Sequence, residues 1–446
     1  MNVKSIPIPE KFMKSLSRTQ RLKATFVNLQ EDETKLSTQR LGQEFVTNLL
    51  PKAVFARSVV DLCDNAFREI LENIIVYLGP KFVGENIFRK IYSEKLGNGL
   101  KNTVVTEAKD LLSNSKILSN DTKEIKEAKK KLIEDNKTLM SVKAAIAVSA
   151  LAIPLAEYSL SYVKNLFTLK MFKQADFNNI ANLNKEKVER DEHQEKVRES
   201  AKKHIKLAGG IFAGCLAFAT LLATKGKNSS ILNHISEAIL APGSDFFKPK
   251  VNDSKEVIKK LEEKAAFFNR YFGLDFKLNE VKDEAGKVIA RKLAMSNGQI
   301  TACVVAGGFG YFGAAKDRGK QDYKEVLYRF PLVGFYAISG AALVDKGFKA
   351  ILRKRGGYEH LLGKDENFKP LKLSELAGKA EELAVKNKTI AEAEFKKLFK
   401  QKSIIVLAPF LFSVGVMGFF VASCSRYFTQ YRYNKEMQEK QQNIAK

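Results

Sequence analysis

The sequence from Ser403 to Ser425 reads SIIVLAPFLFSVGVMGFFVASCS and contains no charged side chain. As a helix this stretch would be about 34 Å long, at a rise of 1.5 Å per residue. The hydrocarbon core of a bilayer is about 30 Å thick, so the stretch is long enough to cross it. An apolar run of this kind, in a chain otherwise rich in charge, predicts an integral membrane protein.

Four further apolar runs precede this one. Residues 207–224 and 293–315 carry no charge, and residues 144–163 carry only Glu157. Residues 330–344 are also uncharged, but this run is short, so it fits a tilted partial span, a re-entrant segment or a buried helix. We therefore predict an all-α membrane protein with four or five apolar transmembrane or re-entrant helices.

Large polar segments separate these runs, and charge pairs at i,i+4 spacing predict that they are solvated helices. The predicted order is a charged, amphipathic N-terminal region (1–143), a first membrane pair (144–163 and 207–224) with a polar insert (164–206), a polar region (225–292), a second membrane pair (293–315 and 330–344), a basic polar region (345–402), the last span (403–425) and a basic aromatic tail (426–446).

Two patterns predict further elements in the polar segments. Apolar residues recur at 3/4 spacing from Phe67 to Leu78 and again from Phe82 to Tyr92, which predicts two amphipathic helices. We expect their apolar faces to pack on each other or on the membrane bundle, the alternative being a partner groove. Alternation around residues 274–278 and 288–290, on either side of a turn at 283–286, predicts one small β-hairpin.

The formal net charge of +25 favours anionic partners, either nucleic acid or a membrane surface. The basic residues are interleaved with acids instead of forming one stripe with aromatics, which disfavours nucleic acid. A basic cluster directly follows run 330–344 and has the layout of a site for anionic lipid headgroups. Its members are Lys346, Lys349, Arg353, Lys354 and Arg355. The same cluster can instead be a topology signal.

The distribution of Lys and Arg favours a cytoplasmic N-terminus, because most of them fall in segments that would then lie inside. The basic stretches 196–206 and 316–320 argue against this topology. A membrane hairpin with all polar segments on one side would remove the conflict.

Small residues and one acid are the candidate functional residues inside the runs. Gly210 and Gly214 have the spacing that lets two helices approach closely in lipid. Gly310 belongs to a G-x-G-x-x-G pattern at 308–313, which we interpret as helix packing because no suitable helix follows for a dinucleotide site. Glu157 is an ionisable group at membrane depth or at the interface, and is therefore a candidate site residue.

No catalytic, metal or cofactor motif is visible. The four cysteines form no CxxC pair and the four histidines are scattered, so we expect no structural metal and no cofactor. The sequence alone therefore names no activity. It leaves a membrane scaffold or membrane-organising protein as the first hypothesis, which protein partners or a second copy could join. A small-solute transporter or channel is the alternative, and a lipid-modifying membrane enzyme is a second alternative.

The apolar runs generate a direct prediction about extraction. The protein should stay in the membrane pellet after washing with alkaline carbonate, because several lipid-buried helices hold it, and it should need detergent for release. Immunoblotting of pellet and supernatant measures this. Release by carbonate alone would exclude an integral membrane protein.

Overall fold

The computed structural model describes residues 6–31, 42–79, 121–184, 186, 188–226, 230–250, 252–282, 288–363 and 370–444. The amphipathic helix expected at 82–92 and the hairpin turn expected at 283–286 lie outside these residues. The chain divides into two compact units. Unit 1 comprises Met1–Thr47 and Phe335–Val421, and unit 2 comprises Asn48–Gly334 and Ala422–Lys446.

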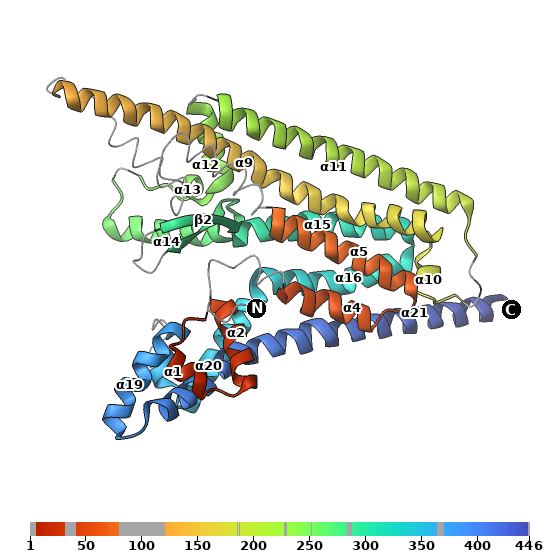
Figure 1. The fold of residues 1–446 in the computed structure, drawn as a ribbon. Coiled ribbons are helices and arrows are strands. Elements are labelled where there is room, and N and C mark those ends of the chain that lie inside the picture. Colours follow the sequence, from red (N-terminus) through yellow and green to blue (C-terminus); the bar gives the residue numbers. More distant parts are fainter. Residues whose placement is uncertain are drawn as a thin grey trace. The chain divides into compact units, whose positions relative to one another are not determined.

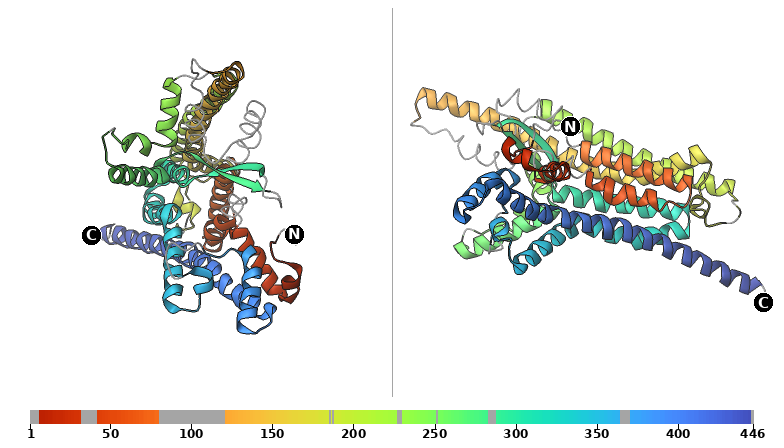
Figure 2. Two further views of the ribbon diagram at one scale, coloured as in Figure 1. Left: turned by 90° about the vertical axis from the view of Figure 1, so that its left-hand side faces the viewer. Right: turned by 60° about the horizontal axis from the view of Figure 1, so that its bottom comes forward.

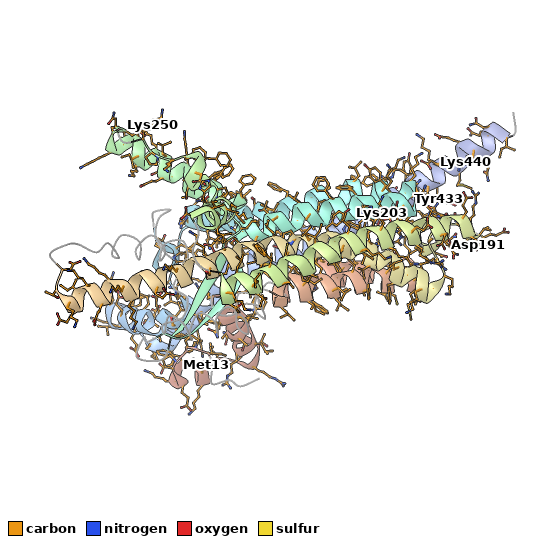
Figure 3. The ribbon with its side chains drawn as sticks, turned by 90° about the horizontal axis from the view of Figure 1, so that it is seen from above. Met13, Asp191, Lys203, Lys250, Tyr433 and Lys440 are labelled. Atoms are coloured by element: carbon orange, nitrogen blue, oxygen red, sulfur yellow. The ribbon has the colours of Figure 1, made fainter. Side chains whose placement is uncertain are left out.

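Unit 2 is built on two long helices that lie side by side, α9 (Lys123–Phe172) and α11 (Asp191–Lys225) (Figures 1 and 2). Figure 3 shows α11 along α9 from above, starting at Asp191. The helices are antiparallel, because Tyr158 of α9 bonds to His204 of α11 while the earlier part of α9 packs against the later part of α11. Apolar side chains including Ile146, Ile153 and Leu222 form the core there.

The ends of α9 follow from local chemistry. The Thr122 hydroxyl accepts a hydrogen bond from the Ile125 N–H, which caps the start of the helix. Lys173 adopts a left-handed conformation with φ of 57°, which ends the helix after 50 residues.

The remaining elements of unit 2 surround this pair. They are α4 (Leu50–Val54), α5 (Val59–Asn73), the π-helix η4 (Ile74–Leu78), α10 (Phe177–Ile180), α12 (Ser230–Leu240), α13 (Gly243–Phe246), α14 (Lys255–Phe272), β1 (Phe276–Lys282), β2 (Val288–Met295), α15 (Asn297–Arg318), α16 (Lys320–Phe335) and α21 (Val421–Ile444). Strands β1 and β2 form one antiparallel pair in which Phe276 lies opposite Met295.

Helix α15 differs from the apolar run 293–315 that the sequence indicated. The first residues of that run belong to strand β2, and the helix begins only at Asn297. Ser296 sets this boundary, because its hydroxyl accepts a hydrogen bond from the Gln299 N–H and so caps the helix. The helix then runs parallel to α9, with Gln299 bonded to the Ala150 carbonyl and Asn165 bonded to the Ala314 carbonyl.

Unit 1 is a separate helical assembly. Its elements are α1 (Glu10–Ser15), α2 (Arg18–Glu31), the π-helix η6 (Tyr336–Gly340), α17 (Ala341–Arg355), α18 (Glu359–Leu362), the 3₁₀ turn η7 (Leu373–Glu375), α19 (Leu376–Asn387), α20 (Ala391–Phe412) and the π-helix η8 (Ser413–Phe420), with η3 (Phe45–Leu49) at its boundary. Phe12 and Phe395 lie at its core, with ring centroids 4.7 Å apart, and Phe399 is buried beside them.

Four helices among the described residues are long and apolar enough to cross a membrane. They are Lys143–Phe172, Asp191–Lys225, Lys320–Arg355 and Ala391–Ile444. They contain the predicted runs 144–163, 207–224, 330–344 and 403–425. The short run 330–344 thus belongs to a helix long enough to span. The mostly helical fold is confirmed, and the four helices are counted by length and composition alone.

The glycines generate a matched test of helix packing. A Cβ at Gly310 would lie 2.0 Å from the Tyr158 carbonyl oxygen, whereas a Cβ at Gly210 would meet no described atom within 4 Å. We expect Gly310→Ala to lower the thermal stability of the detergent-purified protein, because α15 and α9 must separate. Gly210→Ala should leave it unchanged or raise it slightly, because Ala favours a helix over Gly and meets no atom there. Equal melting temperatures for the two variants would contradict the close approach of α15 and α9.

Candidate functional site: a buried charge network

Helix α5 buries most of its charged residues and exposes several of its apolar ones. Asp61, Asp64 and Arg68 recur at i, i+3 and i+7, which places them on one helix face, and all three are buried. By contrast, the Val59 side chain is 71% exposed and Ile70 is 48% exposed.

The apolar face of residues 67–78 packs on the bundle in part, since Phe67 stacks on Phe167 of α9 and Val76 lies in the core with α9 and α11, whereas Ile70 is exposed. The packing of this face against the helix expected at 82–92 stays a prediction.

Helix α16 shows the same reversal. Asp322, Glu325 and Arg329 are buried, while Leu327 is 51% exposed and Leu332 is 47% exposed. Soluble proteins bury most of their large apolar side chains and rarely bury unpaired charges. Both helices thus turn their polar side toward the interior of unit 2.

Arg68 forms the first cluster of the network. Its Nη1 lies 2.9 Å from Glu69 and 2.6 Å from Glu72, and its Nη2 lies 3.3 Å from Glu157 of α9. Glu69 also pairs with Lys52 of α4. One guanidinium therefore joins α5 to α9.

Glycine makes room for this cluster. A Cβ at Gly307 of α15 would lie 2.8 Å from Glu157 Cγ and 2.9 Å from its Oε1. The missing side chain lets the Glu157 carboxylate lie against α15.

Asp64 forms the second cluster. Its Oδ2 lies 3.0 Å from Arg318 Nη1 of α15 and 3.2 Å from Lys164 Nζ of α9, and its Oδ1 accepts a hydrogen bond from the Thr168 hydroxyl. Arg318 is only 1% exposed, and its Nε lies 3.4 Å from Asp322 of α16. Two carboxylates thus hold one buried guanidinium among four helices.

Arg426 of α21 forms the third cluster. Its Nη1 lies 3.2 Å from Asp61 and 3.1 Å from Glu325. The side chain of Arg57 closes the group, because it lies 3.6 Å from Asp61 and 3.1 Å from Glu325. Helices α5, α16 and α21 are joined by this arrangement.

Tyr311 of α15 lies between the first two clusters. Its ring centroid is 4.7 Å from the Arg68 guanidinium and 5.3 Å from Lys164 Nζ, distances at which a cation is attracted to the face of an aromatic ring. Helices α5 and α16 each supply residues to both the second and the third cluster. We call the three clusters together the charge network.

Each carboxylate of the charge network has a cation within 4 Å. The carboxylates are Asp61, Asp64, Glu69, Glu72, Glu157, Asp322 and Glu325, and their cations are Lys52, Arg57, Arg68, Lys164, Arg318 and Arg426. Lys52 lies outside the candidate spans, and burial lowers its pKa to about 8, although the carboxylate of Glu69 opposes this shift.

Of the residues singled out from the sequence, Glu157 belongs to the charge network. Gly210 and Gly214 of α11 meet no described atom within 4 Å of an added Cβ, so their packing role stays a prediction about another molecule. The G-x-G-x-x-G pattern at 308–313 lies in the middle of helix α15, not between a strand and a helix. No dinucleotide-binding turn is formed there.

The basic cluster of the sequence lies on α17 in unit 1. Lys346, Lys354 and Arg355 are exposed, whereas Lys349 and Arg353 are half-buried.

The described residues hold no group of three or more His, Cys, Asp or Glu side chains suited to a metal ion. A comparison of the chain with protein-family models, with curated proteins and with solved structures found no match.

The charge network generates a stability prediction. Asp64→Asn keeps the side-chain volume but leaves Arg318 and Lys164 without their shared carboxylate. Breaking one partner out of a buried ion pair costs about 3–5 kcal/mol, so thermal unfolding in detergent should shift strongly downward.

The matched control for this variant is Glu256→Gln, which removes the exposed pair between Glu256 and Lys260 on α14. Exposed pairs contribute about 0–1 kcal/mol, so this variant should unfold at nearly the wild-type temperature. Similar small shifts for both variants would show that the charge network does not hold unit 2 together.

Proposed function

We propose that this chain is a multi-pass membrane protein in which the charged interior of unit 2 lies among lipid-facing helices. The reversed faces of α5 and α16 support this proposal. In water an exposed apolar face and a buried charged face are both unfavourable, whereas in lipid the apolar face is solvated and the charges must pair inside. The four apolar helices supply the spans.

We further propose that the charge network passes protons or small ions across the membrane. Two observations favour a transporter or channel over a scaffold. The apolar runs themselves contain few charged residues, but Glu157 pairs with Arg68 in a buried cluster of charges that neighbouring helices supply. Ionisable groups inside a bundle, paired with one another, are typical of ion pathways and proton relays.

The second observation is the irregularity of two candidate spans. Lys320–Arg355 contains Pro331 and the π-helix η6, and Ala391–Ile444 contains Pro409 and the π-helix η8. Proline and π-helical turns interrupt the regular backbone hydrogen bonds, and such interruptions are frequent at functional sites. Transporters commonly bind their ions where spans are broken in this way.

A membrane scaffold is the second candidate, and the complete pairing of the carboxylates favours it. A network in which each carboxylate already has a cation can fix the helices in register without moving any ion. A cytoplasmic N-terminus, and binding of anionic headgroups by the α17 cluster, remain part of both proposals.

Flux through proteoliposomes separates the two candidates. Wild-type protein should dissipate a proton, sodium or potassium gradient faster than protein-free vesicles, as read by an entrapped fluorescent indicator. Glu157→Gln should reduce this flux at least about tenfold, because the neutral amide cannot exchange a proton or pair with Arg68. Glu192→Gln, on the exposed face of α11, should leave the flux unchanged.

Gel filtration and circular dichroism establish first that each variant is folded. Flux indistinguishable from empty vesicles for all three ions would reject the transport proposal and leave the scaffold. Wild-type flux in folded Glu157→Gln protein would remove Glu157 from the pathway.

A further inference from the structure

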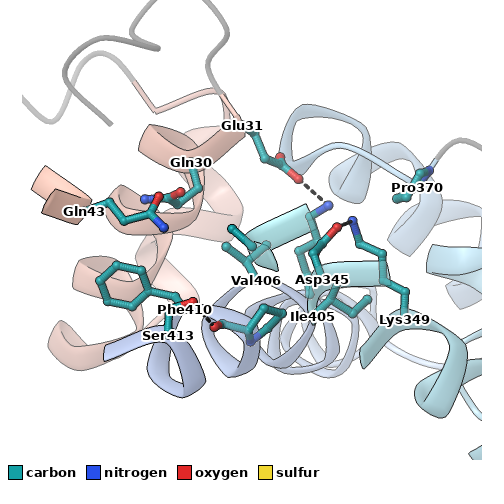
Figure 4. A pocket seen from close by; sticks show the side chains of 13 residues that line it. Gln30, Glu31, Gln43, Asp345, Lys349, Pro370, Ile405, Val406, Phe410 and Ser413 are labelled. Carbon is teal, nitrogen blue, oxygen red and sulfur yellow. Dashed lines mark hydrogen bonds and ion pairs between the residues drawn. The ribbon is translucent and has the colours of Figure 1, made fainter. Parts of the chain in front are cut away.

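Unit 1 contains a cavity of about 340 Å³ that the charge network does not include. Helices α2, α17 and α20 line it, with the first residue of η8 (Figure 4). It therefore lies wholly within one unit, and the inference drawn from it stands whether or not unit 2 transports ions.

The charged lining of this cavity is balanced. Glu31 of α2 pairs with Lys402 of α20, and Asp345 of α17 lies 2.5 Å from Lys349 Nζ on the next turn (Figure 4). Lys402 is nearly buried, whereas the side chain of Asp345 is 43% exposed and that of Lys349 is 25% exposed. A ligand can thus reach one carboxylate and one ammonium group side by side.

The rest of the lining changes from polar to apolar along α20. Lys402 is the last charged residue before the uncharged run that begins at Ser403, and Val406, Pro409 and Phe410 line the cavity beyond it. The charged residues of the cavity therefore stand at the head of a candidate span, where lipid headgroups lie.

We propose that this cavity binds the headgroup of a zwitterionic phospholipid that carries a primary ammonium, as in phosphatidylethanolamine. The ammonium exchanges into the place of Lys349 beside Asp345, and the lipid phosphate pairs with the Lys349 ammonium that is released. The proximal acyl chain lies along Val406, Pro409 and Phe410.

Charge and hydrogen bonding select this headgroup. The lining holds two carboxylates and two ammonium groups, so a net-anionic lipid that takes Lys349 would leave Asp345 without its ammonium, whereas a zwitterion brings a replacement. A primary ammonium has N–H donors, so it can replace the hydrogen bond that Lys349 Nζ donates to Asp345. A quaternary ammonium has no such donor, so phosphatidylcholine should bind more weakly.

The test measures the thermal stability of the detergent-purified full chain while short-chain lipids are titrated. Phosphatidylethanolamine should raise the melting temperature saturably, at concentrations about tenfold lower than phosphatidylglycerol or phosphatidylcholine require. Asp345→Asn and Lys349→Gln should each abolish this preference. Lys386→Gln, at an exposed basic residue of α19 outside both the lining and the α17 cluster, should retain it.

The unliganded melting temperatures show whether the variants fold, and both should lie near the wild-type value because the pair between Asp345 and Lys349 is partly exposed. The absence of any preference for phosphatidylethanolamine, or an undiminished preference in folded Asp345→Asn protein, would overturn the proposal. Phosphoethanolamine without acyl chains should have little effect. An equal effect would assign the cavity to a soluble zwitterion and reject the lipid.

Discussion

Unit 2 depends on the pairing of Asp64 with Arg318 and Lys164. One carboxylate on α5 faces a guanidinium from α15 and an ammonium from α9, at 3.0 and 3.2 Å. Each of these charges is buried, and an isolated buried charge costs far more free energy than a folded domain has to spare. The three helices can therefore be buried together only if all three charges meet, and this condition fixes both their rotation and their register.

The same condition explains why the apolar faces of α5 and α16 point outward. A helix with charged residues on one face and apolar residues on the other can bury only one of the two faces in the protein interior. Here the charges have partners on neighbouring helices, so the interior takes the charged face and Ile70 and Leu332 remain exposed. An apolar solvent around unit 2 would make this orientation favourable for both faces, which is the argument for a lipid environment.

Much of the helical framework was predictable, because long uncharged runs such as 403–425 leave few alternatives to a helix. The helix predicted over 293–315 began too early. Hydropathy alone does not reveal that Ser296 caps the helix and that strand β2 precedes it. The network was missed, although the spacing of Asp61, Asp64 and Arg68 on one face was visible. Its partners Arg318 and Arg426 lie hundreds of residues away, and pairing at such separation leaves no periodic signal in one sequence.

The long separation between Asp64 and Arg318, 254 residues along the chain, also bears on the order of assembly during synthesis. Helix α5 leaves the ribosome long before α15 exists. Under our proposal that unit 2 lies in lipid, the charged face of α5 is too costly to enter the bilayer alone, so the helix would wait at the membrane surface, or beside the insertion machinery, until the basic residues of α9 and α15 have been made. The assembly of unit 2 would then be a late, cooperative event, in which α5 packs into the bundle only after α15 has been synthesised.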